Sequence, residues 1–578
     1  MTFASGARSR AKPGAEGWDG SAGPGPQDSR LPSRPTLIVL AVALLYFVVL
    51  WVSAPSVGYT RDEGYYFKAA EEYAGWWGVL FSRDFTSAFS DATILKFFNY
   101  NHEHPPLVKL TQGLTYHLFH GLLGVASPAQ GFRVAGFLFA SLSVVATYLL
   151  GRALVSARVG VVAAILLTAI PRYFFDAHLA CFDVPITAMW TLSIFFFVRA
   201  YRAPPEKVVR FAVEAGLVWG LGLATKLNAL FLPAVFVFLW FIAPPESLRP
   251  RLLRNLGGGL DVRLPRIPLV LVACALIGPV VFVVTWPYLW HDTFLRIGTY
   301  IGFHLHHEHY PISYFHQLLV KPPFPWGFPI VMSAVTVPGP IFGLGAIGFI
   351  VATVRTFFRR SLGDATLFAA TALPVFLIAM PDTPIFGGVK HWYNAMPSLS
   401  ILAATVLFWG VALVRERLGQ SAGRLAVPVA VALAALPGYL GAAHTHPNGI
   451  GYYNALAGGI AGGAELGMQR GFWGYMAYPL YPELGERMGA RGRVFFNRTN
   501  YDSYRMYQRE GVIPQTIYYA NYPKGADAGV SFEQPEHAEK EGELWSVMGT
   551  RPVDGVYQDN VTLIQLYQVG PSAEPPSR

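Results

Sequence analysis

Two short clusters of ionisable residues are the parts of this sequence best suited to chemistry. Asp62-Glu63 and Glu103-His104 lie on one stretch, YTRDEGYYFKAAEEYAGWW followed by LKFFNYNHEHPPLVKL. A carboxylate can accept a proton as a general base, and Lys or His can stabilise negative charge that develops in a reaction. A largely apolar chain that gathers so many ionisable groups is expected to bring them together at a site.

Later residues extend this set. Asp183 precedes Pro185 at an expected helix start, and Lys226 lies between two apolar runs, where its ammonium could meet a phosphate. The run HLHHEHY, residues 304–310, is rich in imidazole and fits metal ligation. Each feature also has a structural explanation. Asp62 and Asp183 could cap helices, Lys226 could snorkel to the interface, and the histidines could form an ordinary solvated loop.

Composition sets the class of protein. The chain has 578 residues, of which 53% are hydrophobic and 14% charged, against roughly 25% charged in soluble domains. It is therefore expected to be an integral membrane protein. The net charge of +9 comes mostly from Lys and Arg in short loops between apolar runs, which is typical of cytoplasmic loops and not of a nucleic-acid partner. Cys181 and Cys274 predict no disulfide framework.

The basic residues also predict the topology. Residues 1–34 are rich in Gly, Pro and Ser and are expected to form a disordered cytoplasmic tail. The first apolar run then crosses the membrane and places the loop 56–131 outside. Residues 106–123 contain Lys, Gln and His, so we expect an interfacial helix that does not cross. A crossing there would place Arg152 and Arg158 outside, against the positive-inside rule.

These expectations give an all-α polytopic membrane domain, residues 35–443, with a second outer loop at 287–325. Residues 444–578 have shorter strand-like runs and predict a small extracytoplasmic α/β domain. The membrane domain should contain about eleven spans, at 35–54, 132–150, 159–171, 184–199, 211–225, 227–241, 267–286, 328–354, 365–380, 392–414 and 425–443.

This topology places the acidic residues, both lysines and the histidine run at one level, the outer surface. Ionisable groups at membrane depth cost roughly 2.5–3.5 kcal/mol each, so such a set indicates a functional site. A secondary transporter or flippase is the alternative function. Transporters, however, place ionisable residues near the midplane on broken helices, often within inverted repeats. No such repeat is evident, and a receptor would not explain acids that share one level.

Several motifs resemble those of the GT-C membrane glycosyltransferases, in particular the bacterial relatives of protein O-mannosyltransferase and of aminoarabinose transferase. They are DEGYYF after the first span, EHPPLVKL, a lone Asp before a later span, and ATKLNALFLP. GGVKHWYNAMPSLSILAA and HTHPNGIGYYNALAGG resemble the later parts of that group. The likeness covers roughly residues 36 to 475.

The resemblance implies a GT-C bundle that transfers a sugar from a polyprenyl-phosphate-linked donor to an acceptor hydroxyl. The acceptor is a protein, a lipid or a polysaccharide. The active site would face the outer, periplasmic side of the inner (plasma) membrane, where the lipid donor resides. By this resemblance Asp62 matches the catalytic Asp and Asp183 the second acidic position.

The same resemblance suggests which residues bind the donor. Glu103 matches an acidic residue near the donor phosphate or a bound divalent metal cation. His104 stands where aminoarabinose transferases carry Lys, so a neighbouring lysine is expected to take over phosphate binding. The predicted donor-binding residues are Glu63, Glu103, His104, Lys109, Lys226 and His391, and the predicted metal ligands are Glu103, His304 and His307.

Overall fold

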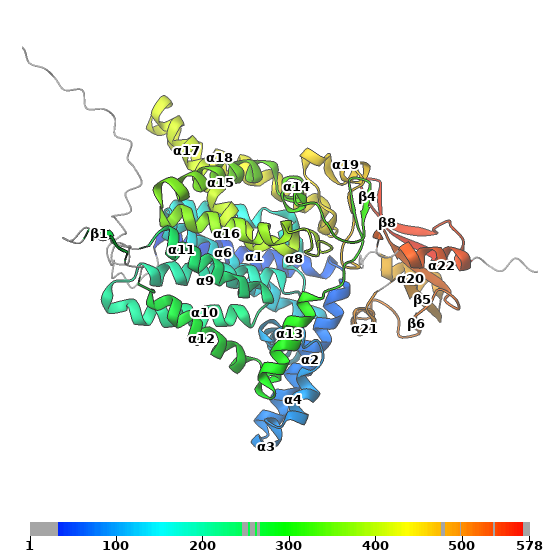
Figure 1. The fold of residues 1–578 in the computed structure, drawn as a ribbon. Helices are drawn as coiled ribbons and strands as arrows, with labels where there is room; N and C mark the ends of the chain where they lie inside the picture. The colour runs from blue at the N-terminus through cyan, green and yellow to red at the C-terminus, as the bar shows by residue number, and fades with distance from the viewer. Residues whose placement is uncertain are drawn as a thin grey trace, which may run out of the picture.

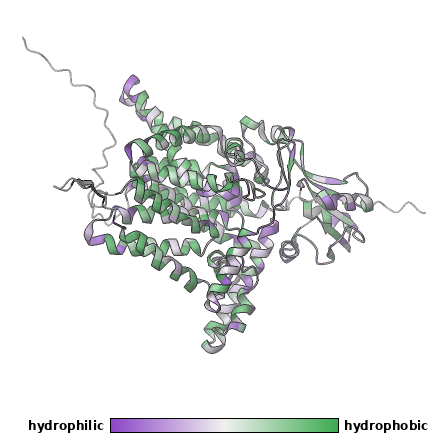
Figure 2. Cartoon of the chain, viewed as in Figure 1, coloured by the Kyte–Doolittle hydropathy of each residue, from purple (hydrophilic) through white to green (hydrophobic). Residues whose placement is uncertain are grey.

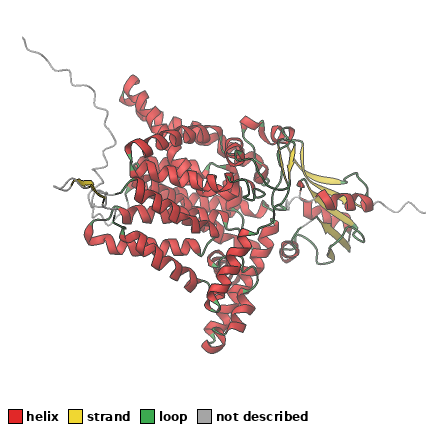
Figure 3. Ribbon diagram, in the orientation of Figure 1, coloured by secondary structure: helices red, strands yellow, loops and turns green. Residues whose placement is uncertain are grey.

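The structure, a computed structural model, describes residues 33–244, 252–254, 260–262, 266–475, 480–489, 491–497, 499–535 and 538–569. Residues 1–32 of the predicted tail lie outside the described residues. A bundle of helices makes up most of the molecule, and a smaller unit containing a sheet lies at one end of it (Figures 1 and 3). The predicted all-α membrane domain and C-terminal α/β domain are therefore both present.

Apolar helices lie side by side in the bundle, and most of their residues are hydrophobic (Figure 2). Large apolar side chains point outward from them, such as Val52, which is 71% exposed. The bundle comprises α1 (Arg34–Ser53), α6 (Pro128–Leu154), α7 (Ala157–Thr168), α8 (Pro171–Ala177), α9 (Asp183–Tyr201), α10 (Val208–Leu223), α11 (Leu232–Ile242), α12 (Leu269–Thr285), α14 (Phe328–Thr336), α15 (Gly339–Arg359), α16 (Leu362–Ala379), α17 (Met396–Leu418) and α18 (Gln420–Thr445).

Seven helices of the described residues are long and apolar enough to cross a membrane, or eight if the bent pair α7–α8 counts as one span. The chain is thus a multi-pass membrane protein, but the count of about eleven spans is not confirmed. Expected spans at 211–225, 227–241 and 267–286 form shorter helices. The longest of them, α12, has 17 residues, or about 25 Å at 1.5 Å per residue, short of a hydrocarbon core of roughly 30 Å.

Breaks also divide two of the expected spans. Helices α7 and α8 meet at a bend of 75°, and Pro171 begins the second of them. The expected span 328–354 is two helices, α14 and α15, which are separated by Val337 and Pro338. Proline has no N–H for the helical ladder, so a helix tends to restart at it.

Helices of the two expected outer loops, 56–131 and 287–325, lie at the end of the bundle that carries the C-terminal unit, and α2, α4 and α13 run across the bundle helices (Figure 1). They are α2 (Arg61–Phe81), α3 (Phe85–Ala88), α4 (Asp91–Phe98), α5 (Leu107–Thr115) and α13 (Thr293–Leu305). A π-helical segment, η2 (Tyr116–Leu122), continues α5. Neither α5 nor η2 is among the candidate spans. The interfacial position of residues 106–123 stays a prediction.

The C-terminal unit contains a five-stranded sheet of order β6-β5-β7-β9-β8. Strand β5 pairs in parallel with β6 and β7, whereas β9 pairs antiparallel with β7 and β8. The strands are β5 (Gly492–Phe496), β6 (Ile517–Ala520), β7 (Ala528–Phe532), β8 (Asp554–Gln558) and β9 (Val561–Gln568), and the helices are α20 (Leu480–Met488), α21 (Tyr501–Arg509) and α22 (Ala538–Met548).

Short elements complete the described chain. The hairpin β1 (Leu252–Arg254) and β2 (Leu260–Val262) lies at the end of the bundle opposite the C-terminal sheet (Figure 1). The others are β3 (Ile312–Tyr314), β4 (Gln317–Leu319), α19 (Gly459–Glu465), η1 (Ala54–Ser56), η3 (Pro205–Lys207), η4 (Leu227–Phe231), η6 (Pro287–Trp290), η7 (Gly388–Ala395), η8 (Gly449–Gly451) and η9 (Ala455–Ala457).

Candidate active site

Helix α2 presents Asp62 at its first turn. The N-cap of this helix is Thr60, whose hydroxyl accepts from the Glu63 N–H at 3.3 Å, while the Glu63 carboxylate accepts from the Thr60 N–H at 3.0 Å. This reciprocal capping box satisfies the helix start without Asp62. The capping explanation for Asp62 is therefore wrong, and its carboxylate is available for other contacts.

Each of the two predicted catalytic aspartates pairs with a lysine. Lys390, on η7, donates to Oδ2 of Asp62 at 3.3 Å, and Lys226 donates to Oδ1 of Asp183 at 2.7 Å. Asp183 is the first residue of α9 and makes no side-chain capping bond. The Asp62 side chain is 23% exposed and that of Asp183 only 7%. Asp62 is thus the more accessible carboxylate.

Three predicted acids converge on one phenol, that of Tyr66. Burial raises the pKa of Tyr66 well above its ordinary value, and the carboxylates of Asp62, Asp183 and Glu103 act in the same direction. Like charge nearby disfavours a phenolate, so the effect marks groups that are close in space. Residues from three separate stretches of the sequence are therefore close enough to influence a single side chain.

Basic groups lie on the other side of this cluster, around His104. Burial lowers the pKa of His104 well below its ordinary value, and the nearby His304, Lys109, Lys226 and Lys390 lower it further. The rings of His104 and His304 are 5.7 Å apart. Three lysines and a second imidazole are thus near His104, an arrangement suited to an anionic group such as a phosphate.

Glu63 has a structural position. Its carboxylate accepts from Nε and Nη2 of Arg133 at 2.8 and 2.9 Å, from the Ala180 N–H at 2.9 Å, and from Thr60. Both side chains of the Glu63–Arg133 pair are buried, at 0% and 3% exposure. These bonds occupy the carboxylate's acceptor sites, which leaves none for a donor group. The geometry supports a positioning role for Glu63: it holds α2 against α6 and the loop before α9.

Lys109 likewise has a structural position. Its buried ammonium donates to the hydroxyl of Tyr73 at 2.8 Å and to the carbonyls of Asn101 and His104 at 2.6 and 2.8 Å. Burial lowers the pKa of Lys109 well below its ordinary value. Two of these hydrogen bonds go to the loop that carries Glu103 and His104 and the third goes to Tyr73 on α2, so Lys109 fixes this loop against α2.

The predicted metal ligands do not come together. The part of the chain that the structure describes has no group of three or more His, Cys, Asp or Glu side chains suited to a metal ion. His304 contacts the backbone carbonyl of Glu103, 3.0 Å from Nε2, and not its carboxylate. The His307 ring stacks on Phe386 at 5.1 Å. The residues present therefore do not fit the divalent cation expected from Glu103, His304 and His307.

His391 was predicted to bind the donor, but its neighbour Lys390 is the residue that reaches the acids. Nε2 of His391 accepts from the Gly387 N–H at 3.2 Å and so closes the turn from which Lys390 extends. The Lys390 ammonium also lies 4.0 Å from the centroid of the Trp473 ring. Both Lys390 and His391 belong to the KHWYN motif, but the motif alone does not show which of the two faces the site.

Residues 103–282 match the family model described as dolichyl-phosphate-mannose-protein mannosyltransferase. The matched segment includes Glu103, His104, Asp183 and Lys226, whereas Asp62 and Lys390 lie outside it. A comparison with curated protein sequences gives no match.

Solved structures with a similar course of the chain include those of two proteins. ArnT from Cupriavidus metallidurans in the apo state is 17% identical, with a TM-score of 0.49 and coverage of 94% of this chain and 99% of that one. The oligosaccharyltransferase of Archaeoglobus fulgidus in the apo form is 13% identical, with a TM-score of 0.46 and coverage of 86% and 69%. Both scores are below 0.5, so no residue role is carried over from them. Over residues 103–282 the chain is therefore similar to the family of the dolichyl-phosphate-mannose-protein mannosyltransferases.

Proposed function

We propose that this protein transfers a sugar from a polyprenyl-phosphate-linked donor to an acceptor hydroxyl at the outer face of the inner membrane. The observation that carries the proposal is that each of the two aspartates pairs with a lysine, Asp62 with Lys390 at 3.3 Å and Asp183 with Lys226 at 2.7 Å. The cluster lies in and around the segment that matches the mannosyltransferase family. That family's description names a lipid-phosphate-linked mannose and a protein acceptor, which makes these the first substrates to test.

In this reaction Asp62 is the general base. A hydroxyl is a poor nucleophile because its pKa is high, so the Asp62 carboxylate accepts its proton while the oxygen bonds to the anomeric carbon. The bond from that carbon to the phosphate oxygen breaks, and the leaving polyprenyl phosphate keeps the electron pair. Lys226 and Lys390 stabilise its negative charge. Asp183 holds Lys226 through the 2.7 Å contact and so orients one of these cations.

The bundle explains how a lipid-linked donor reaches the site. A polyprenyl tail stays in the hydrocarbon core while its phosphate lies at the interface. The candidate site lies at the start of α9, one of the candidate spans, and of α2, which runs across the end of the bundle. A secondary transporter or flippase, the alternative function, would carry its substrate through the bundle without breaking a bond.

The test follows sugar transfer and movement of the intact donor in proteoliposomes that contain polyprenyl-phosphate mannose and a Ser/Thr-containing peptide. The expected result is release of polyprenyl phosphate together with a mannosylated peptide. If the peptide is inert, comparing the lipids of cells with and without the protein identifies the accumulated donor, and the assay is repeated with that donor. Movement of an intact donor between leaflets, with no polyprenyl phosphate released, would overturn the proposal in favour of a flippase.

A further inference from the structure

The C-terminal α/β unit directly contacts the few residues that precede Asp62. The hydroxyl of Ser503, on α21, donates to the carbonyl of Thr60 at 2.9 Å. The hydroxyl of Tyr507 accepts from the Tyr59 N–H, also at 2.9 Å. Thr60 is the N-cap of α2, so these bonds act on the residues that set where the helix begins. The C-terminal unit therefore helps to define the position of α2.

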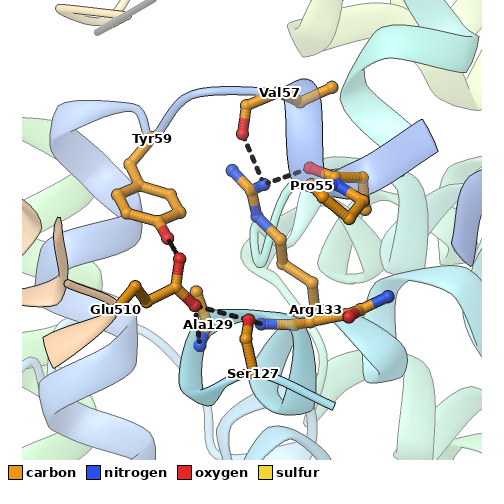
Figure 4. Close-up of a pocket in the computed structure, with 9 residues that line it drawn as sticks. Pro55, Val57, Tyr59, Ser127, Ala129, Arg133 and Glu510 are labelled. Atoms are coloured by element: carbon orange, nitrogen blue, oxygen red, sulfur yellow. Dashed lines mark hydrogen bonds between the residues drawn. The ribbon is translucent and has the colours of Figure 1, made fainter. Parts of the chain in front are cut away.

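Glu510, the residue after α21, makes several hydrogen bonds between the C-terminal unit and the rest of the chain. Its carboxylate accepts from the hydroxyls of Tyr59 and Ser127 and from the Ala129 N–H at 3.0 Å (Figure 4). Ser127 is the N-cap of α6. A carboxylate at a helix N-terminus meets free N–H groups and the positive end of the helix dipole. Glu510 thus joins the C-terminal unit to α6 and to Tyr59 in a single set of charge-assisted hydrogen bonds.

The Tyr59 ring contacts both the C-terminal unit and α6. The centroid of this ring is 4.2 Å from that of Tyr507. The guanidinium carbon of Arg133, a residue of α6, lies 4.8 Å from the centroid of the Tyr59 ring. Arg133 also donates to the carbonyls of Val57 and Gly58 at 2.8 and 2.6 Å. The segment 57–60 is therefore enclosed between α6 and the C-terminal unit.

Helices α2 and α21 approach so closely that only glycine fits between them. A Cβ atom on Gly64 would lie 2.4 Å from Oγ and 2.5 Å from the backbone nitrogen of Ser503. Such distances are far below van der Waals contact, so a side chain at position 64 would push α21 away. Asp62 is two residues from this contact, and its direction depends on how the two helices are docked.

We propose that Glu510 is a positioning residue for glycosyl transfer: by fixing the C-terminal unit on α6 and Tyr59, it holds Asp62 in place for proton abstraction. The inference rests on the proposed function. Glu510 acts through Tyr59 and the N-cap and touches neither of the two lysines expected to bind phosphate. Its removal should therefore alter turnover and leave donor affinity nearly unchanged.

The test compares Glu510→Gln with Glu543→Gln, a control on α22 whose exposed carboxylate contacts Lys540. A misplacement of about 1 Å can lower a rate roughly 100-fold, so we expect kcat of Glu510→Gln to fall about 10- to 100-fold with KM for the donor unchanged. Hydrogen exchange in residues 57–66 should accelerate only in Glu510→Gln. Glu510→Asp keeps the charge and should recover part of kcat.

A second variant keeps the test decisive if Glu510→Gln does not fold. Tyr59→Phe removes only the hydroxyl that donates to Glu510 and retains the ring between Tyr507 and Arg133, so it should lower kcat in the same way. Wild-type kcat in both variants, or faster exchange without a loss of kcat, would overturn the positioning role. Absence of transfer by the wild-type protein would instead overturn the proposed function, while exchange would still report whether Glu510 holds residues 57–66.

Discussion

The Lys390 ammonium lies 3.3 Å from the carboxylate of Asp62, although 328 positions separate the two residues in the chain. The contact joins the first turn of α2 to the turn that precedes α17. Lys390 is 8% exposed and packs on the Trp473 ring, so its position is set by the fold and not by solvent. The proposed base and a proposed phosphate-binding cation are thus held as neighbours before any substrate arrives.

Asp62→Asn should lower turnover by about 10²- to 10⁴-fold, because an amide cannot accept the proton of the acceptor hydroxyl. Folding and donor binding should be largely retained, since Thr60 and Glu63 form the cap of α2 without Asp62. The measurement is kcat together with the affinity for polyprenyl phosphate. Near-normal turnover would exclude Asp62 as the base.

Lys226→Met should weaken binding of polyprenyl phosphate by roughly 10-fold or more, the loss expected for one hydrogen bond to a charged group. Lys226→Arg keeps the charge and should retain most of the affinity. Lys321→Met, at an exposed position in the segment 287–325, serves as the control and should bind like the wild type. Equal affinities in Lys226→Met and Lys321→Met would remove Lys226 from the phosphate site.

Glu63→Gln should destabilise the fold by about 3–5 kcal/mol, because it leaves the buried Arg133 guanidinium without its counter-charge. The matched change Glu71→Gln affects a carboxylate on the same helix that is 51% exposed and pairs with Arg509 at 3.4 Å. Such surface pairs contribute about 0–1 kcal/mol. Thermal unfolding in detergent should separate the two variants, and equal melting temperatures would contradict the structural role of Glu63.

Stability should depend on pH through His304. Burial lowers the pKa of His304 to about 4 from its ordinary 6.5, so the unfolded chain binds a proton at this residue that the folded chain does not. Stability from this residue is therefore complete above pH 6.5 and is lost as the pH falls toward about 4. In His304→Gln the melting temperature should vary less with pH over that interval. In His306→Gln, at an exposed position, it should vary with pH as in the wild type. A wild-type profile in His304→Gln would contradict the assignment.

The topology predicts which positions a membrane-impermeant maleimide labels on intact cells. With Cys181 and Cys274 replaced by Ser, a cysteine at position 207 should be protected, and one at position 524, in the C-terminal unit, should react. Both lysines at these positions are exposed in the structure. Labelling at 207 from outside would reverse the orientation of the bundle.

Much of the bundle could be predicted from the sequence because hydropathy and loop charge are local properties. Every expected span corresponds to a helix or a broken helix pair. The number of full spans could not be predicted in the same way. Whether a short apolar run such as 211–225 crosses the membrane or ends within it depends on what packs beside it. A Cβ on Gly220 of α10 would lie 2.5 Å from Cβ of Val281, so α10 and α12 are closely packed at this glycine.

The sequence predicts the acidic residues of the candidate site better than it predicts the basic residues that pair with them. Asp62, Asp183 and Glu103 follow from motif and topology, whereas Lys390 and Arg133 are paired with residues 328 and 70 positions away. Arg133 did leave a signal, since a charge at the start of an apolar span requires a buried partner. The position of Arg133 in the sequence indicates that a carboxylate must pair with it, but only the fold shows that Glu63 is this carboxylate.

The bond between Ser503 and Thr60 spans 443 positions, which has a consequence for the order of events during synthesis. A ribosome adds about 5–20 residues per second, so Ser503 emerges roughly 20 to 90 s after Thr60. Through that interval the bundle helices can already insert and pair, but α2 lacks the partner against which its first turn is docked. The nascent protein is therefore expected to stay inactive until the C-terminal unit has folded against α2.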